Sequence, residues 1–392
     1  MNDCFMNTYH RLPVVFTEGR GAQLTDQAGK TYLDFTSGIA VNCLGHNHPA
    51  LVRAVSSQAA KLIHTSNYFL SDTSLVFADR LVAACKALGM ERVFLSNSGA
   101  EANEGAIKIA RKYSQTRYGN GRHRIVTLKG SFHGRTLTTL SATGQDRFHP
   151  DSFAPYTEGF IFVERNDLAA MEKALDGTVA AVLMEPIQGE SGIRPLDRAY
   201  VQAVAQLCRE RDVLLMFDEV QSGVGRTGTF LASELFQVEA DVITLAKGLA
   251  GGVPVGAVLA GGRTAEVLGV GDHGSTFGGN PLAAAAGLAV LDTVNRPEML
   301  AEIRRKGDLI METVRSWQHP QVGEIRGRGL MIGIDIVSDA WPVLEAALAK
   351  GLLLLSAGQK TLRLLPPYII SDAEIKEGLG ILKSVLDNLP PQ

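Results

Sequence analysis

From about residue 51, short apolar segments alternate with segments of helical periodicity. The apolar segments are rich in Val, Ile, Leu and Phe and lack alternating polar positions, which is typical of strands buried on both faces of a sheet. Helices between such strands predict parallel crossovers and an α/β layered sheet. We expect strands at Arg92–Leu95, Arg124–Leu128, Phe160–Val163, Ala180–Met184, Val213–Phe217, Val242–Leu245 and Val255–Leu259.

The two ends of the chain follow a different pattern. Before residue 51 we expect extended segments at Gln23–Thr25 and Thr31–Phe35, joined by a turn at Asp26–Gly29. After about residue 290, short strands alternate with helices. These elements are expected at Glu298–Val314, Leu330–Ile336, Ala340–Lys350, Leu352–Leu355, Leu362–Leu365 and Asp372–Leu386. The pattern predicts a large α/β domain at 51–289 and a smaller domain formed by 1–50 and 290–392.

The composition narrows the class of protein without identifying it. The chain has 392 residues, of which 45% are hydrophobic, and its formal net charge is −3. This hydrophobic fraction excludes a disordered chain, which combines low hydrophobicity with high net charge. The balanced charge leaves no basic field that would attract nucleic acid. A compact soluble enzyme fits these values.

Neither the cysteines nor the apolar segments indicate a secreted, metal-binding or membrane protein. The four scattered cysteines form no C-x-x-C pair, and the histidines show no metal-ligand spacing. About the longest apolar stretch, Leu282–Leu291, is well short of the roughly 18 residues of a membrane span. Residues Met1–Met6 lack the basic and apolar segments of a secretory signal. We therefore expect a cytoplasmic protein without a bound metal.

The segment after the first expected buried strand has the pattern of a helix start. Ser98 followed by Glu101 three residues later is the pattern of a capping box, which satisfies only some N–H groups. Those around Gly99 and Ala100 stay free, and the helix dipole favours an anion there. The segment predicts either a phosphate cradle or an ordinary helix start, and this motif alone favours the ordinary start.

Two charged residues follow neighbouring expected strands. Asp218, after Val213–Phe217, either caps the next turn or is a fixed anion that keeps a heterocyclic nitrogen protonated. Lys247, after Val242–Leu245, precedes a glycine-rich loop. Burial there would lower the pKa of the amine and give the neutral form that a Schiff base needs. Because ligands of open α/β sheets bind outside the carboxyl ends of strands, we expect both side chains in one cleft.

Two arginines are candidates for anion binding. Arg135 closes the stretch Phe132-His133-Gly134-Arg135 after the expected strand Arg124–Leu128, so a guanidinium and an aromatic ring are expected near the same sheet edge. Arg363 lies among apolar neighbours, and a semi-buried arginine needs an anionic partner. That partner is either a substrate carboxylate or a carboxylate of the protein.

One motif points to a different class of enzyme. Gly223–Gly228 matches G-x-G-x-x-G, the fingerprint of nicotinamide-dependent oxidoreductases. Such a site needs its first glycine directly after a strand and a helix that opens through the third. Here Glu219–Ser222 separate the strand from the first glycine, and Thr227-Gly228-Thr229 is a poor helix start. The match therefore gives weak support to a dinucleotide site.

Five motifs, taken together, resemble one family. They are SNSGAEANEGAIKIAR (Ser96–Arg111), EPIQGE (Glu185–Glu190), FDEVQSGVGRTG (Phe217–Gly228), LAKGLAGGVPVGA (Leu245–Ala257) and HGSTFGGNPLA (His273–Ala283). In this order and spacing they resemble the class III, fold-type I, pyridoxal-phosphate aminotransferases, from about Thr25 to Pro366. The resemblance implies an α/β fold whose mostly parallel central sheet is flanked by helices, with a small α+β domain from both chain ends.

The resemblance implies a site for pyridoxal 5′-phosphate. Lys247 would form the Schiff base with the cofactor and later move the proton between the substrate Cα and the cofactor C4′. Asp218 would pair with the ring nitrogen and keep the ring an electron sink. Phe132 and Val220 would cover the two ring faces, and Gln221 would lie beside the ring hydroxyl. The other cofactor-binding residues implied are Ser98, Gly99 and Ala100 near the phosphate, Glu185, and Thr276 from the second subunit of a homodimer.

The resemblance also implies the substrates. Three further stretches are most similar to the members that transfer the δ-amino group of N2-acetylornithine to 2-oxoglutarate in arginine biosynthesis: HTSN (His64–Asn67), FHGRT (Phe132–Thr136) and RGRGLMIGI (Arg326–Ile334). Ser275 and Arg135 would hold acetylornithine, with Arg135 on its α-carboxylate. Arg363 would bind the α-carboxylate of glutamate or 2-oxoglutarate. Glu190 would neutralise Arg363 while the amine substrate is bound.

Two departures from the family pattern leave the acyl preference open. Ser191 follows Glu190 where the family usually has glycine, and Tyr68-Phe69-Leu70 replaces the commoner Leu-Tyr-Tyr after HTSN. The alternatives within the family are ornithine, 4-aminobutyrate, succinylornithine and succinyldiaminopimelate aminotransferases. A non-catalytic pyridoxal-phosphate protein is a further alternative, which Lys247 and Asp218 together with both substrate arginines disfavour.

Overall fold

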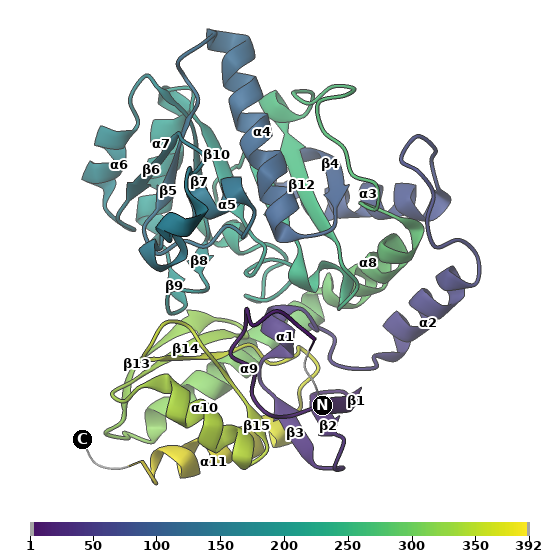
Figure 1. Ribbon diagram of the computed structural model, residues 1–392, viewed down its shortest axis with the longest axis vertical. Coiled ribbons are helices and arrows are strands. Elements are labelled where there is room, and N and C mark those ends of the chain that lie inside the picture. The colour runs from purple at the N-terminus through teal and green to yellow at the C-terminus, as the bar shows by residue number, and fades with distance from the viewer. Residues whose placement is uncertain (1–3, 390–392) are drawn as a thin grey trace.

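The computed structural model describes residues 4–389, which form β-sheets surrounded by helices (Figure 1). Residues 1–3 and 390–392 lie outside the described part; they include the first residues of Met1–Met6 and the two ends of the expected small domain. The largest sheet has the strand order β4-β12-β11-β10-β7-β5-β6. Its strands are β4 (Met90–Ser96), β5 (Arg124–Leu128), β6 (Phe160–Val163), β7 (Val179–Met184), β10 (Leu214–Asp218), β11 (Val242–Leu245) and β12 (Gly256–Gly261).

Both faces of this sheet are covered, as the apolar strands predict. Along β10, Leu214 and Met216 pack with the buried face of α4 (Gly99–Tyr118), whereas Leu215 and Phe217 belong to the main core on the other face. Side chains of successive strand residues point to opposite faces, so this division follows from the alternation of the strand. The main core also contains the buried faces of α3 (Asp72–Ala84), α7 (Arg198–Glu210) and α8 (Pro281–Val294).

The sheet is mostly parallel, which confirms the expected fold class, and the exception is β12. β12 pairs antiparallel with both β11 and β4, whereas β10 is parallel to β7 and β11. The chain between β11 and β12 contains only the short 3-10 turn η5 (Lys247–Ala250), which is too short for a crossover. The edge strands β4 and β6 are also partly exposed, so burial on both faces does not extend to them.

Strands near the chain ends form two smaller sheets below the large one, and the first of them joins segments from both ends (Figure 1). In the first, β3 pairs in parallel with β15, which places Leu33 opposite Leu352. The second has the order β13-β14-β17-β16. The strands are β1 (Phe16–Arg20), β2 (Gln23–Asp26), β3 (Thr31–Asp34), β13 (Val322–Arg328), β14 (Met331–Ile336), β15 (Leu352–Leu353), β16 (Leu355–Ser356) and β17 (Thr361–Leu364).

The expected helices of the C-terminal region are α9 (Pro297–Ser316), α10 (Ala340–Ala349) and α11 (Asp372–Leu386). Two helices run across the expected domain boundaries, α2 (Pro49–Ala59) at one and α8 at the other. The boundaries at residues 50 and 289 therefore remain a prediction. Among residues 4–389, no helix has the length and hydropathy needed to cross a bilayer.

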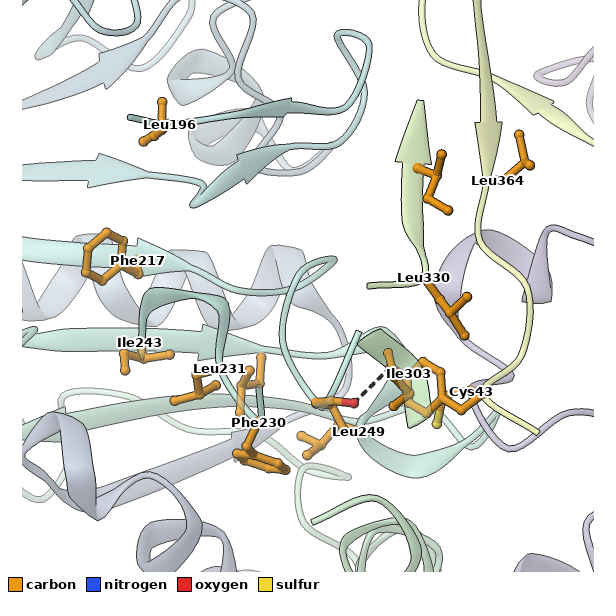
Figure 2. Close-up of a cluster of buried hydrophobic side chains, with 14 of the residues drawn as sticks. Cys43, Leu196, Phe217, Phe230, Leu231, Ile243, Leu249, Ile303, Leu330 and Leu364 are labelled. Atoms are coloured by element: carbon orange, nitrogen blue, oxygen red, sulfur yellow. Dashed lines mark hydrogen bonds between the residues drawn. The ribbon is translucent and has the colours of Figure 1, made fainter. Parts of the chain in front are cut away.

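One cluster of buried side chains joins the large sheet to the smaller ones. It contains Phe217 and Ile243 from the large sheet and Leu330 and Leu364 from the C-terminal region (Figure 2). In the same cluster the Cys43 thiol donates a hydrogen bond to the carbonyl of Gly248, at 3.3 Å. The loop that carries Lys247 is therefore packed directly against the N-terminal segment.

A short turn before this cysteine has a backbone that the sequence did not predict. The residues of α1 (Ser37–Ala40) all have positive φ, with values of 46°, 61°, 65° and 64°. Left-handed helical backbone costs roughly 1–2 kcal/mol for each residue other than glycine. The buried carboxylate of Asp34 opposes this cost by accepting hydrogen bonds from the backbone N–H groups of Thr36 and Ser37, at 2.8 and 3.0 Å.

Two helical glycines provide a matched test of how closely the helices pack. A Cβ at Gly287 of α8 would lie 2.4 Å from Cε2 of Phe77 in α3, whereas no described atom lies within 4 Å of a Cβ at Gly380 of α11. Gly287→Ala should therefore lower the free energy of unfolding by about 1–3 kcal/mol, because the core is overpacked. Gly380→Ala should raise it by about 0.5–1 kcal/mol, because alanine is the better helix former.

Equilibrium urea denaturation followed by circular dichroism measures both changes. If Gly287→Ala were as stable as the parent chain, the close approach of α3 and α8 would be wrong.

Candidate active site

A cavity of about 440 Å³ lies at the carboxyl ends of the central strands. Asp218 reaches it from the end of β10, and Lys247 reaches it from the residues after β11. Ten of the predicted site residues line it: Ser98, Gly99, Ala100, Phe132, Arg135, Glu185, Asp218, Val220, Gln221 and Lys247. The other four predicted residues, Glu190, Ser275, Thr276 and Arg363, do not line this cavity.

The start of α4 forms one wall of the cavity. Ser98 caps it, with Oγ accepting a hydrogen bond from the Glu101 N–H at 3.2 Å. The predicted reciprocal capping box is wrong, because the Glu101 carboxylate instead accepts the backbone N–H of Asn97, at 2.7 Å. Among residues 4–389, the N–H groups of Gly99 and Ala100 donate no hydrogen bond. They remain available to an anion in the cavity.

Glycine at position 99 is required by a close contact. A Cβ there would lie 2.7 Å from Cγ1 of Val220, which no real Cβ tolerates. Val220 lies two residues after Asp218, which ends β10, and it lines the same cavity. The small residue therefore lets an apolar side chain lie against the helix start, beside the two free N–H groups.

Asp218 is a buried acceptor fixed from three directions. Its Oδ2 accepts hydrogen bonds from Asn103 Nδ2 at 2.7 Å and from His133 Nδ1 at 2.8 Å. Its Oδ1 accepts the backbone N–H of Val220 at 3.0 Å. Charge-assisted hydrogen bonds of this kind hold a carboxylate in one orientation. The anion thus has a fixed position at the floor of the cavity.

Two of these supporting residues escaped the sequence analysis. Thr244 on β11 donates to the Asn103 carbonyl oxygen at 2.7 Å, so the Asn103 amide nitrogen must face Asp218. The same nitrogen donates to the backbone carbonyl of His133 at 2.8 Å. Asn103 lies within the motif Ser96–Arg111, but the motif does not show its role, because that role depends on the packing of α4 against β11. His133 lies in the stretch Phe132–Arg135, and its contact with Asp218 is not evident from the sequence.

Lys247 has an unusual backbone and an unusual charge environment. Its φ is 43°, a left-handed conformation that is uncommon for residues other than glycine and is found at functional sites. Burial lowers the pKa of its amine, while the nearby carboxylates of Glu190 and Asp218 partly oppose this effect. The direction of the shift favours the neutral amine, as expected from the sequence.

Glu185 joins two loops at the edge of the cavity. Its carboxylate accepts the backbone N–H of Phe132 at 2.9 Å and that of Gly189 at 3.1 Å. Burial raises its pKa to about 7, with the nearby charges of His133 and Asp218 acting in opposite directions. The ring of Phe132 and the loop that carries Glu190 are therefore held by the same side chain.

Arg363 is paired with a carboxylate of the protein. Its Nη1 lies 2.5 Å from Oε1 of Glu190, and Gln221 bridges to both, with N···O distances of 3.3 and 3.4 Å. Burial alone would raise the pKa of Glu190, but the charge and hydrogen bond of Arg363, together with the charge of Lys247 and the hydrogen bond from Gln221, lower that pKa below its usual value. Arg363 Nε is buried without a hydrogen-bond partner among the described residues. Because Gln221 lines the cavity, the pair lies directly behind one wall.

Arg135 is held in a different way. Its guanidinium carbon lies 5.6 Å from the ring centroid of Phe132 and 4.2 Å from that of Phe148. No hydrogen bond or ion pair links its side chain to another residue in the described part of the chain. The cavity therefore has one arginine paired with a carboxylate behind its wall and one unpaired arginine at its mouth.

The remaining predicted positions lie on the rim or on the surface. Ser275 Oγ accepts hydrogen bonds from Asn97 Nδ2 at 3.1 Å and from the Gly278 N–H at 2.9 Å, whereas Thr276 is exposed. Ser191, which follows Glu190 where the family usually has glycine, donates a hydrogen bond from its hydroxyl to Gln188 Oε1 at 3.3 Å. A Cβ at Gly130 would lie 3.1 Å from the same hydroxyl, so glycine at 130 makes room for the serine.

The residues of the cavity fit pyridoxal phosphate. Asp218 is a fixed anion for a protonated ring nitrogen, and two free N–H groups at a helix start suit a phosphate. Val220 and Phe132 supply apolar walls, and Lys247 supplies an amine. By contrast, Gly223–Gly228 forms turns without a helix, so this segment lacks the structure of a dinucleotide-binding loop.

Comparison with protein families gives one match over nearly the whole chain. The model of the class-III aminotransferases matches residues 4–386. Among curated proteins, the acetylornithine aminotransferase of Caldanaerobacter subterraneus subsp. tengcongensis is 47% identical over 387 residues, which cover 98% of this chain and 97% of that protein. Acetylornithine aminotransferase 1 of Bordetella bronchiseptica is 48% identical, with 97% of both proteins covered.

Solved structures of two kinds of aminotransferase, named for different substrates, share this fold. The ornithine aminotransferase of Toxoplasma gondii ME49 superposes with a TM-score of 0.92 at 34% identity, covering 97% of this chain and 92% of that one. The N-acetylornithine aminotransferase of Stenotrophomonas maltophilia K279a superposes with a TM-score of 0.84 at 39% identity, covering 97% of both chains. Overall shape therefore does not separate these two activities.

The charge environment of Lys247 leads to a test in the apoprotein. Glu190→Gln removes an anion that raises the pKa of the lysine, so that pKa should fall further. Because the neutral amine forms above its pKa, the rate at which apoprotein captures pyridoxal phosphate should reach half its maximum at a lower pH. Stopped-flow absorbance across a pH series measures this midpoint. Glu324→Gln, which changes an exposed carboxylate paired with Arg194, is the control. An unchanged or higher midpoint in Glu190→Gln would contradict the assigned environment.

Proposed function

The chain belongs to the class-III aminotransferase family, which uses pyridoxal phosphate, and we propose that it acts on N2-acetylornithine. The reaction moves the δ-amino group to 2-oxoglutarate and gives N-acetylglutamate 5-semialdehyde and glutamate, a step of arginine biosynthesis. One observation carries the proposal. A single cavity brings together a lysine with a lowered pKa, a fixed anion and an unpaired arginine, with a second, paired arginine behind its wall.

The catalytic groups of the proposal are Lys247 and Asp218. Pyridoxal phosphate supplies an electron sink for the carbon that carries the amino group. Lys247 Nζ would take the proton from that carbon and pass it to the cofactor C4′, and in the second half of the transfer it would move a proton the other way, from C4′ to the α-carbon of the keto acid. Asp218 keeps the proton on the ring nitrogen, and its three hydrogen bonds prevent it from turning away.

The remaining cofactor contacts follow from the walls of the cavity. Gly99 and Ala100 would donate their N–H groups to the phosphate, below the cap formed by Ser98. Phe132 and Val220 would cover the two ring faces, because both are apolar side chains that line the cavity. The other proposed contacts are those of Gln221 near the ring hydroxyl and of Glu185, which holds the Phe132 loop.

Two unlike substrates share the site through two unlike arginines. Arg135, with Ser275 on the adjoining rim, would hold acetylornithine by its α-carboxylate. Arg363 would bind the α-carboxylate of glutamate or 2-oxoglutarate, which must displace Glu190 from its present contact. While the amine substrate is bound, the contact with Glu190 keeps Arg363 neutralised, so an uncompensated buried charge is avoided.

The charges at the mouth favour an acylated amine over free ornithine. The α-amino group of free ornithine is a cation, and its binding beside Arg135 would require a nearby carboxylate. In the described part of the chain, the only carboxylates that line the cavity are Glu185 and Asp218, and both already accept hydrogen bonds at its floor. An acetyl group removes the charge and instead presents an apolar methyl and an amide.

Free ornithine remains the second candidate, because the solved ornithine aminotransferase superposes with a TM-score of 0.92. Spectra of the holoenzyme recorded before and after each amine discriminate the two. N2-acetylornithine should replace the visible band with a near-ultraviolet band at least about tenfold faster than ornithine does, because an uncompensated charge costs about 1.4 kcal/mol or more. Adding 2-oxoglutarate should restore the visible band. Faster conversion by free ornithine would overturn the acetylornithine assignment.

We further propose a homodimer whose active sites lie at the subunit interface. An exposed apolar patch surrounds Thr276, and we name it the rim patch: Ile63, Tyr68, Phe69, Leu70 and Phe277. Tyr68 and Leu70 are 95% and 81% exposed. Asn67 Nδ2 joins the two segments of the patch through hydrogen bonds to the carbonyls of Ser275 and Gly278, at 2.9 and 3.1 Å. Contiguous exposed apolar surface of this kind marks an interaction site.

In the dimer, Thr276 of one subunit would reach the phosphate bound by the other. Changing both Tyr68→Ser and Leu70→Ser should shift the protein from dimer to monomer and weaken cofactor retention, because the interface loses its most exposed apolar side chains. Sedimentation velocity and the amount of cofactor kept after gel filtration measure the two effects. Val337→Ser, which removes an exposed apolar side chain outside the rim patch, is the control. A double variant that stays dimeric would contradict this interface.

We also propose the division into a large domain at 51–289 and a small domain formed by 1–50 and 290–392. Its support is the pairing of β3 with β15, which joins both chain ends in one sheet. A cytoplasmic location is proposed because Cys43, Cys85 and Cys208 are buried thiols outside any disulfide, which fits a reducing compartment.

A further inference from the structure

Phe148 lies beside the proposed substrate arginine and has no assigned role. It ends the short turn η2 (Asp146–Phe148), and its side chain is half-buried. We propose that Phe148 is a positioning residue for the amine substrate: its ring holds the Arg135 guanidinium at the mouth of the cavity, where the guanidinium meets the substrate carboxylate. This inference rests on the proposed function, because it needs Arg135 to bind that carboxylate.

The contacts of Arg135 explain why a positioning residue is needed. A long arginine side chain without a partner loses rotamer freedom when it binds a ligand, and that loss weakens binding. Arg363 is held by Glu190, but within residues 4–389 the Arg135 guanidinium contacts two aromatic rings and no carboxylate. Its carbon lies 4.2 Å from the Phe148 centroid and 5.6 Å from the Phe132 centroid, so Phe148 is the nearer support.

The two rings form a corner around the guanidinium. Their centroids are 5.6 Å apart, and their planes meet at 71°, an edge-to-face arrangement that is favourable in itself. Cation–π attraction places a guanidinium over a ring face without neutralising its charge. This differs from the effect of a carboxylate, which would compete with the substrate for the same N–H groups. An aromatic support therefore orders Arg135 and leaves its donors free.

Phe148 can act as a support because its own segment is anchored. Gln145, just before η2, donates from Nε2 to the carbonyl of Ser131 at 3.0 Å. The N–H of Gly144 donates to the hydroxyl of Ser131, also at 3.0 Å. Ser131 directly precedes Phe132, so the two rings are carried by segments that are tied together. The corner is thus part of the loop framework and does not depend on the arginine.

A second cation near the same ring tests the specificity of this role. Arg147 also lies over Phe148, with its guanidinium carbon 4.6 Å from the centroid. Arg147 is not among the residues that line the cavity, whereas Arg135 is. If Phe148 acts on the substrate, it does so through Arg135.

The experiment compares two amine donors that differ in one group. N2-acetylornithine carries the α-carboxylate, and N-acetylputrescine is the same molecule without it. Single-turnover rates of the holoenzyme give kcat/KM of the amine half-reaction for each donor. Phe148→Leu should lower the value for N2-acetylornithine by about 3- to 30-fold, the range expected for loss of a cation–π contact, and should leave that for N-acetylputrescine within about twofold. Phe148→Tyr, which keeps the ring, should restore the parent ratio.

Three controls separate positioning from a general loss of structure. Phe153→Leu removes an exposed phenylalanine from the neighbouring turn η3 (Asp151–Phe153) and should leave kcat/KM unchanged for both donors. Arg147→Ala should likewise leave the ratio of the two donors unchanged. In an Arg135→Ala background, Phe148→Leu should have almost no further effect, because the group that it positions is absent.

The outcomes also separate this inference from the proposed function. If kcat/KM of the parent enzyme were no higher for the donor with the carboxylate, the proposed recognition of that group by Arg135 would be wrong, and the role of Phe148 would be wrong with it. If the parent enzyme prefers that donor, two results would show that Phe148 is not a positioning residue while the proposed function stands. One is that Phe148→Leu lowers kcat/KM equally for both donors, and the other is that its effect is as large in the Arg135→Ala background.

Discussion

The buried carboxylate of Asp218 is the constraint on which the rest of the site depends. An unpaired carboxylate in the core would be costly, so the structure surrounds it with donors. Asn103 reaches it from α4, His133 from the loop after β5, and the Val220 N–H from the turn after β10. Thr244 on β11 fixes the amide of Asn103. One charge therefore ties a helix, two strand ends and a loop to the same point, and that point is the floor of the cavity.

The two arginines show how one cavity can serve two kinds of substrate. Arg363 is buried, so its charge requires a carboxylate, and Glu190 supplies it. Arg135 is exposed at the mouth, where water screens its charge and aromatic rings are sufficient to hold it. In the proposed function, a substrate with one carboxylate would be bound at the mouth without disturbing the buried pair. A dicarboxylic substrate would compete for the buried arginine as well, because its second carboxylate would replace that of the protein.

The loop that carries Lys247 also depends on the N-terminal segment. The Cys43 thiol donates to the carbonyl of Gly248, next to Lys247, and a left-handed turn at Ser37–Ala40 precedes this cysteine. Such a turn is unfavourable alone and is kept by the buried carboxylate of Asp34 and by packing. Lys247 itself has a positive φ. Left-handed backbone thus occurs both at Lys247 and in the N-terminal turn, in segments held by the shared core seen in Figure 2.

The sequence by itself determined the strands of the large sheet, the three helices of the C-terminal region and the candidate residues of the site. Apolar runs identify the strands of the large sheet because burial on two faces excludes polar residues. Asp218 and Lys247 stand out because charged residues at the ends of such runs are unusual. The family motifs then give the cofactor and the order of the elements.

Only the tertiary structure decided strand direction, the supports of the site and its left-handed turn. β12 is antiparallel because no crossover helix follows β11, and the apolar pattern of a strand is the same in either direction. The Glu101 carboxylate accepts the N–H of Asn97 and not that of Ser98, which the capping-box motif predicts, because hydrogen-bond partners depend on local geometry. The roles of Asn103 and Phe148 cannot be read from any motif, although Asn103 lies in one, because those roles exist only where α4 meets β11 and where η2 meets the Phe132 loop. Residue types and spacing record what can react, whereas the contacts that orient those groups join residues far apart in the chain and arise only on folding.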